Sequence, residues 1–488
     1  MPAIKPTVTL PLLLALLLGG APGAWPQSDD ESAEPSTVTG LMGPGLESET
    51  TESEVVDEED ERIEPRIAAH ERMMRLMDER RYPEAIEAAS ETLNLTEAEF
   101  GNVDIRIVAP LNNLATLQML NGDLIGSEAN YLRSIAIIEQ REGILSPRLI
   151  NAYIGLGATY NRAKLYDQGA EAFERALRVN HVNDGFYNFE QFKIRDGLTE
   201  SHVGLQDLEE ANFQQEIQVE IQQRKLGEED PEIVNGMYKL GRWYERSGQL
   251  DAARETYQAA RRILYKSSGK DDIAVVDALE GIASTYESQG LMAESANALK
   301  KALEIVESQP EPDSQRSAAL LVRLGDLYTR FNKTRTARAN YERAWQFLST
   351  DEALLTLRDE YFSTPQRVGG LTFSALRFAS GSRSGNDDLL EGYILLGYSV
   401  DDEGHPEDVR VIEADPAGLM DERVTSTMQR SWFRPRFEDG LPVATEGLIY
   451  RHDFRYRNEA QQSPESSKKA LEYPGGRLEY PDSPAEPE

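Results

Sequence analysis

The chain has 488 residues, no cysteine and a formal net charge of −34 at pH 7. This length is enough for two or three domains. The missing cysteines exclude disulfides, thiolate zinc sites, thiol nucleophiles and lipidation of cysteine, and they leave the redox compartment open. The acidic balance, without a basic stripe in the sequence, argues against a nucleic-acid partner.

Residues 1–24 have the pattern of a secretory signal peptide. Lys5 precedes an apolar run from Leu10 to Leu18, and a stretch of small residues follows it. Ala21 and Gly23 fit the small positions before a cleavage site, so the pattern predicts cleavage at the end of this segment. The alternative is an uncleaved anchor in the inner membrane, but the apolar run is shorter than the roughly 20 residues that a spanning helix needs.

Residues 25–65 are predicted to be a disordered acidic linker, and residues 458–488 a disordered tail. Between residues 28 and 64 there are fourteen Asp and Glu against one Arg, with few large apolar side chains. Such a segment cannot bury enough apolar surface to offset the entropy that folding removes. The tail is rich in Pro, Glu and Ser, which is also typical of disorder.

A repeat with a period of 42 residues organises residues 66–350. Its clearest copy alternates small and large apolar residues along two predicted helices, at Leu240, Gly241, Tyr244, Gly248, Ala253, Tyr257 and Ala260. The Leu-Gly pair recurs in this register at Ile282-Ala283, Leu324-Gly325, Leu156-Gly157 and Leu114-Ala115. The period fits seven copies, and the spacing resembles the tetratricopeptide repeat. Each helix pair must stack on its neighbours to bury its apolar face, so the resemblance implies a helical solenoid.

The segment from Arg224 to Ile233, RKLGEEDPEI, resembles the connection between repeats of the kinesin light chain type. In that family an asparagine on the first helix of a repeat contacts the backbone of a bound peptide. Asn113 occupies this position here, so the resemblance implies a peptide-binding groove in which Asn113 takes part.

Repeat geometry predicts that one face of the first helices lines a concave surface. The partner-binding residues predicted on this face are Tyr238, Arg242, Glu245, Glu280, Glu287, Asp326 and Arg330. Their mixed charges favour an extended peptide or a partner helix. The alternative is that these side chains are only solvated.

Residues 365–457 have a different composition and are predicted to form a separate small domain. Residues 369–390 are rich in Gly and Ser, which favours an irregular lead-in. Alternating apolar residues and turn signals then predict a β-β-α-β order. The predicted elements are a strand over Tyr393–Val400, a turn at Asp401–Gly404, a strand over Val409–Ile412, a helix over Asp421–Ser431 and a last strand over Leu448–Arg457.

The segment from Trp432 to Val443, WFRPRFEDGLPV, together with residues 398–404 and 408–412, resembles the C-terminal domain of TonB, the energy transducer of Gram-negative envelopes. In that family the domain binds the periplasmic segment of an outer-membrane receptor. The resemblance therefore implies such a receptor as the partner, bound by strand pairing along the last strand. The partner-binding residues implied on that strand are Leu448, Ile449, Tyr450, His452 and Phe454.

The sequence predicts no catalytic, cofactor or metal site. The five histidines are far apart, and none stands in the His-Glu-x-x-His spacing of a zinc site. Asp401–Gly404 lacks the alternating ligands and the distant Glu of a calcium loop. We therefore expect a protein that binds and is not an enzyme.

Together these patterns predict a mostly α protein, a tetratricopeptide-repeat solenoid followed by a small α+β domain of the TonB C-terminal type. The expected function is the binding of proteins or extended peptides in the periplasm. One alternative is an energy transducer for outer-membrane transport, anchored in the inner membrane by residues 8–24. The other is a scaffold of the cell envelope. Membrane contact is expected only where the N-terminal segment is retained.

Overall fold

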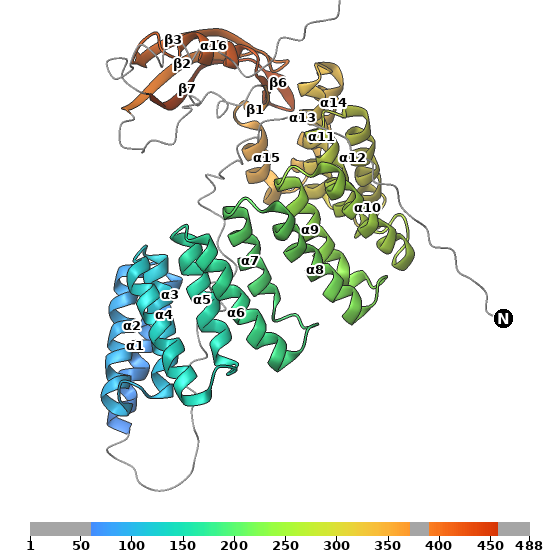
Figure 1. Ribbon diagram of the computed structural model, residues 1–488. Coiled ribbons are helices and arrows are strands. Elements are labelled where there is room, and N and C mark those ends of the chain that lie inside the picture. The colour runs from blue at the N-terminus through green and yellow to red at the C-terminus, as the bar shows by residue number, and fades with distance from the viewer. Residues whose placement is uncertain (1–59, 371–389, 457–488) are drawn as a thin grey trace, which may run out of the picture. The chain divides into compact units, whose positions relative to one another are not determined.

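The computed structural model describes residues 60–370 and 390–456 (Figure 1). The predicted signal peptide, most of the acidic linker and the C-terminal tail lie outside these residues. The chain divides into two compact units, residues 1–228 with 246–248 and residues 229–245 with 249–488. Among the described residues, no helix is both long enough and apolar enough to cross a membrane.

The first unit is built from four consecutive helix pairs (Figure 1). Its helices are α1 (Asp60–Asp78), α2 (Tyr82–Phe100), α3 (Val108–Leu120), α4 (Leu124–Glu142), α5 (Arg148–Arg162), α6 (Tyr166–Asp184), α7 (Phe192–Gly204) and α8 (Leu208–Leu226). Each helix contacts the next along the chain, and one core runs through the stack. The large ring at the same position of the second helix, Tyr131 in α4 and Phe173 in α6, is buried in that core, as the repeat pattern predicts.

The second unit continues the helix pairs and then changes to a sheet. Its helices are α9 (Val234–Arg246), α10 (Leu250–Ser267), α11 (Val275–Ser288), α12 (Met292–Glu307), α13 (Ser314–Arg330), α14 (Thr334–Leu348) and α15 (Leu355–Phe362). The short helix α15 follows the seventh pair and was not predicted. Phe362 is the one buried residue among its eight, and a single buried position carries no periodic signal.

The backbone repeats with the same period as the side-chain pattern. Inside every pair, the turn between the two helices contains one residue with positive φ, and these residues recur at the repeat period: Arg80, Gly122, Lys164, Gln206, Gly248, Gly290 and Asn332. A left-handed residue after a helix lets the last free carbonyls accept hydrogen bonds and turns the chain back. The predicted fold class, a mostly α repeat solenoid, is confirmed.

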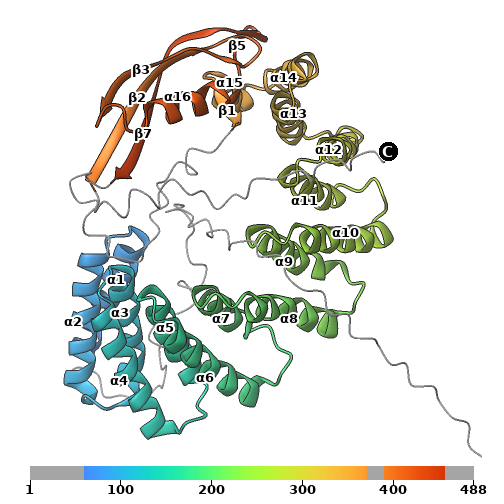
Figure 2. The same ribbon diagram turned by 45° about the horizontal axis from the view of Figure 1, so that its top comes forward.

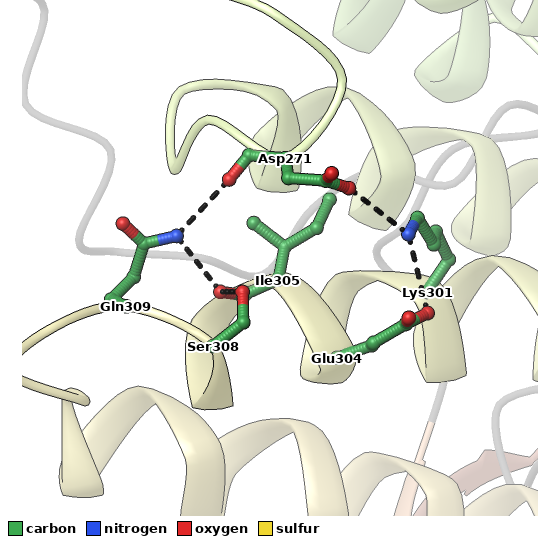
Figure 3. A network of polar contacts seen from close by, with 6 residues as sticks. All are labelled: Asp271, Lys301, Glu304, Ile305, Ser308 and Gln309. Atoms are coloured by element: carbon green, nitrogen blue, oxygen red, sulfur yellow. Dashed lines mark hydrogen bonds and ion pairs between the residues drawn. The ribbon is translucent and has the colours of Figure 1, made fainter.

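Neighbouring repeats are also joined by a recurring polar contact. A side chain at the end of the second helix donates a hydrogen bond to a carbonyl in the preceding inter-repeat loop. The donors and acceptors are Arg141 Nε to Val103 O (3.0 Å), Asn183 Nδ2 to Leu145 O (3.0 Å) and Gln309 Nε2 to Asp271 O (3.1 Å). Figure 3 shows the last of these, where Lys301 Nζ also donates to the Asp271 carboxylate at 3.2 Å. These contacts hold each loop on the next helix pair.

The C-terminal domain contains a three-stranded antiparallel sheet with the order β3-β2-β7, and α16 packs on β3 and β2. Its elements are β1 (Gln366–Gly369), β2 (Leu390–Val400), β3 (Pro406–Asp415), α16 (Asp421–Gln429), β4 (Trp432–Arg434), β5 (Arg436–Glu438), β6 (Leu441–Val443) and β7 (Thr445–Tyr456). Met420, Val424 and Met428, the predicted apolar side of the helix, are buried against this sheet.

The predicted β-β-α-β order is present as β2, β3, α16 and β7, but four short strands were missed. β1 pairs with β4, and β5 pairs with β6. The helix ends at Gln429, before the predicted Ser431, because Trp432 already begins β4. Strands of three or four residues are too short to show an alternating pattern, so only their tertiary partners define them. Most of the predicted irregular lead-in, residues 371–389, lies outside the described residues.

Candidate protein-binding surfaces

The first helices of repeats five to seven bring the predicted groove residues of the second unit onto neighbouring helices. Tyr238, Arg242 and Glu245 lie on α9, Glu280 and Glu287 on α11, and Asp326 and Arg330 on α13. We call this set, together with Asp277 on α11 and Arg316 and Arg323 on α13, the groove cluster. Asn113 belongs to the first unit, where it is on α3 and only 3% exposed.

Ion pairs between α11 and α13 cross the groove cluster. Glu287 accepts from Arg323 Nε at 3.0 Å and from a terminal nitrogen of Arg330 at 2.9 Å. Arg316 pairs with Asp277 one helix away. Arg316, Arg323 and Arg330 are spaced by seven residues, so they share one face of α13. This spacing is visible in the sequence and could have identified Arg316 and Arg323 as further groove residues.

Some buried polar atoms of the groove cluster have no hydrogen-bond partner among the residues that the structure describes. Glu245 accepts a hydrogen bond from Tyr257 Oη at 2.7 Å through one carboxylate oxygen. Its other oxygen, Oε1, is buried and makes no hydrogen bond to the residues that the structure describes, and the same holds for Arg330 Nε. Buried polar atoms are nearly always satisfied in folded proteins, so these exceptions on α9 and α13 mark this face as one that a polar partner can complete.

Burial raises the pKa of two further members of the cluster. The pKa of Tyr238 rises to about 12, chiefly through burial and secondly through the charge of Asp277. The pKa of Glu280 is raised by burial and also by Asp277, although Arg316 and Arg323 oppose the shift. A raised carboxyl pKa means that the folded state prefers the protonated acid, so ionised Glu280 opposes folding at neutral pH.

Replacing Glu280 with glutamine should therefore stabilise the second unit at pH 7. We expect the thermal midpoint to rise by about 1–3 °C, since a weakly unfavourable charge is removed without loss of volume. The folded state holds the Glu280 proton more tightly than the unfolded chain does. The contribution of Glu280 to stability therefore falls as the pH rises from the ordinary pKa of a glutamate to the raised pKa of the folded state. The gain should therefore shrink as the solution approaches pH 4. An unchanged or lowered midpoint at pH 7 would contradict this assignment.

Asp326 has a different neighbour from the rest of the groove cluster. Both of its carboxylate oxygens accept from the guanidinium of Arg434 in β4, at 3.0 and 3.1 Å. Tyr341 Oη donates to the same carboxylate at 2.9 Å. Burial raises the pKa of Asp326, and Arg434 is the strongest influence opposing that shift. Asp326 is thus engaged by the C-terminal domain of its own chain.

The second surface is strand β7, which is an outer strand of the sheet that the structure describes. It pairs with β2 over nearly its whole length, with Leu396 opposite Tyr450 and Gly392 opposite Phe454. Ile449 points its side chain to solvent and is 66% exposed. The predicted residues Leu448, Tyr450 and His452 are half-buried, and Phe454 is buried.

Aromatic rings form a row along the half-buried side of β7. The ring centroids of Tyr450 and His452 are 6.5 Å apart, and those of His452 and Phe454 are 6.2 Å apart, in stacked arrangements. Burial lowers the pKa of His452, against a smaller opposing effect of Asp453. His452 therefore favours the neutral ring within this row.

Comparisons with known proteins agree with this division of the chain. Residues 106–180 and 275–348 match the tetratricopeptide repeat, and residues 388–455 match the Gram-negative bacterial TonB protein C-terminal. The Arabidopsis thaliana protein KINESIN LIGHT CHAIN-RELATED 2 is 27% identical over 192 residues, which cover 39% of this chain. The chain spans 28% of the length of that relative.

Two solved structures illustrate what the chain is similar to. BtubC (BKLC) from P. vanneervenii is 19% identical, with 52% of this chain and 95% of that chain covered and a TM-score of 0.33. YrrB, described as a TPR protein with an unusual peptide-binding site, is 22% identical, with 44% and 93% covered and a TM-score of 0.27. From the two matched models and the seven-fold backbone register, the chain carries a tetratricopeptide-repeat array followed by a TonB-type C-terminal domain.

Proposed function

We propose that the chain is an exported envelope protein that binds two protein partners, one through the repeat array and one through the TonB-type domain. The observation that carries the second part is the position of β7 at the side of its sheet. An outer strand can accept an extended segment as a further strand, with backbone hydrogen bonds supplying affinity and alternate side chains supplying selection. The partner on β7 is a periplasmic segment of an outer-membrane receptor.

Proline substitution in β7 tests strand pairing. Proline has no N–H, and the N–H groups of neighbouring residues in a strand point to opposite sides. Of Ile449→Pro and Tyr450→Pro, one therefore breaks the ladder to β2 and the other removes only an outward donor. The outward variant should keep the thermal midpoint to within about 4 °C and lose receptor binding by about tenfold or more, because proline is tolerated on outer strands.

The binding measurement is recovery of receptors from an envelope extract by the full chain and by each variant. The matched control is the same pair of substitutions at Val411 and Ile412 on β3, the other outer strand of the described sheet. Equal recovery by the wild type and the folded β7 variant would contradict strand pairing at β7. Loss of recovery only in the β3 variants would assign the partner to β3.

The groove cluster is the proposed site of the second partner. The unsatisfied atoms of Glu245 and Arg330 and the unfavourable burial of Glu280 support it, since binding sites retain polar groups that cost stability. An extended peptide can supply both donors and acceptors from its backbone to such a mixed surface. The partner class is therefore an extended peptide.

The anchored energy transducer is the alternative that N-terminal sequencing distinguishes. A mature chain starting near Ala24 would exclude an anchor formed by residues 8–24 and support export. A chain that retains these residues and is recovered with membranes would support the transducer. Recovery of only soluble envelope proteins by the full chain would favour a scaffold.

A further inference from the structure

We infer that the TonB-type domain is the C-terminal cap of the repeat array, and that the segment Trp432–Phe437 holds it on the seventh repeat. We call residues 432–437 the docking segment. It lies within the part of the sequence that resembles TonB, yet two of its side chains, Arg434 and Phe437, contact α13, α14 and α15 of the same chain. This inference does not depend on the proposed partners.

The polar half of the contact is an ion pair between residues far apart in the sequence. Arg434 is only 7% exposed, and its guanidinium binds both oxygens of Asp326 in α13. Its remaining terminal nitrogen donates to the backbone carbonyl of Tyr361 in α15 at 3.0 Å. A bidentate arginine–carboxylate pair fixes orientation as well as distance. All three donating nitrogens of Arg434 are therefore used on the repeat side.

The apolar half is a cluster of aromatic rings around Phe437 in β5. Its ring centroid lies 4.9 Å from that of Phe362, 5.9 Å from that of Trp345 and 6.1 Å from that of Tyr341. Phe437, Phe362 and Tyr341 are all buried. Tyr341 and Trp345 come from α14 and Phe362 comes from α15. The single ring of Phe437 therefore covers aromatic side chains of both helices.

Strand pairing completes the junction. β1 follows α15 after three residues and pairs in antiparallel fashion with β4, which contains Arg434. A Cβ on Gly369 in β1 would lie only 2.5 Å from Arg330 Cγ, so the strand runs directly against α13. Figures 1 and 2 both show β1 beside the last helices. The short connection keeps β1 next to α15, and the pairing of β1 with β4 places Arg434 beside the last helices.

The contact has consequences for both surfaces. A repeat array must cover the apolar side of its last pair, usually with a polar capping helix, and here the docking segment does so. Because Arg434 binds both carboxylate oxygens of Asp326, a peptide in the groove cluster does not pair with that carboxylate while the contact persists. A partner of the TonB-type domain likewise cannot reach Arg434 and Phe437, which are buried in this contact.

The test is a double-mutant cycle on the full chain, with Asp326→Ala, Arg434→Ala and the double variant. Tryptophan fluorescence reports on unfolding, since Trp243, Trp345 and Trp432 all lie in the second unit. Each single change should lower the midpoint by roughly 6–12 °C, because it leaves a buried charge without its partner. The double variant should lose little more than either single one.

Hydrogen exchange measured on the same variants separates docking from local damage. Exchange should rise about tenfold or more both in α14–α15 and in β4–β5, because both sides lose the contact together. The control cycle uses the exposed pair Arg455 and Glu391, whose atoms are 3.7 Å apart, and should shift the midpoint by less than about 2 °C. Arg434→Lys keeps the charge but cannot bind both carboxylate oxygens of Asp326, so it should lower the midpoint by less than Arg434→Ala. It takes the place of Arg434→Ala in the cycle where that variant does not fold. Unchanged exchange, additive losses, or increased exchange on one side alone would overturn the inference.

Discussion

Replacing Phe362 with alanine should lower the free energy of unfolding of the second unit by about 3–5 kcal/mol, the usual cost of truncating a buried phenylalanine. Phe362 is fully buried and contacts the rings of Tyr341, Trp345 and Phe437 at centroid distances of 6.3, 5.7 and 4.9 Å. Its removal leaves a cavity whose walls come from α14, α15 and β5.

The loss can be measured by chemical denaturation followed by tryptophan fluorescence, because Trp345 is part of the cluster. Phe331→Ala is the matched control, since Phe331 ends α13 with a side chain that is 39% exposed. The control should cost less than about 1 kcal/mol. A loss for Phe362→Ala that is no larger than for the control would show that this cluster does not hold the junction.

Replacing Gly197 with valine should destabilise the first unit by about 2–3 kcal/mol, at the upper end of the range for overpacked cores. Gly197 is in the interior of α7, where glycine is normally unfavourable. A Cβ at this position would lie 2.2 Å from ring atoms of Phe173. The ring also lies against Gly157 on its other side, where a Cβ would be 2.7 Å away, so it cannot move aside. The new side chain must therefore force the helices apart.

Hydrogen exchange of α6 and α7 measures this loss in the first unit without a signal from the sheet. Ala129→Val is the matched control, since it adds a β-branched side chain at an exposed position of α4 and should cost less than about 1 kcal/mol. Adding Phe173→Leu to Gly197→Val should restore part of the protection from hydrogen exchange. The smaller leucine makes room for the valine side chain at the same contact. A variant as stable as the wild type would show that the small residue is not required for close packing.

The repeat part of the fold could be predicted because its information is local and is repeated. A glycine such as Gly157 and a ring such as Phe173 recur at a constant distance, so each copy supports the assignment of the others. The C-terminal domain was predicted differently, from the resemblance of three segments and from the order of three predicted strands and one helix. β1 and β4 were not predicted, because strands of three or four residues are too short to show alternation of apolar and polar residues. Their pairing also joins segments that are far apart in the chain.

The candidate surfaces show the same limit. Helical spacing placed Glu280, Glu287 and Arg330 on one face of neighbouring first helices, because register alone determines which side of a helix a residue occupies. Register cannot say which charges neutralise one another. Glu287 binds two arginines across the groove, and whether an ion pair forms depends on distances between helices that only packing sets.

The sequence by itself predicted the repeating helix pairs and a second domain with alternating strands and an amphipathic helix. The tertiary structure alone decided what the TonB-like segment does. Arg434 and Asp326 are 108 residues apart and belong to different sequence patterns, so neither predicts the other. Their pairing follows from burial, because a guanidinium enclosed by aromatic rings must find a carboxylate, and the nearest one belongs to the last repeat.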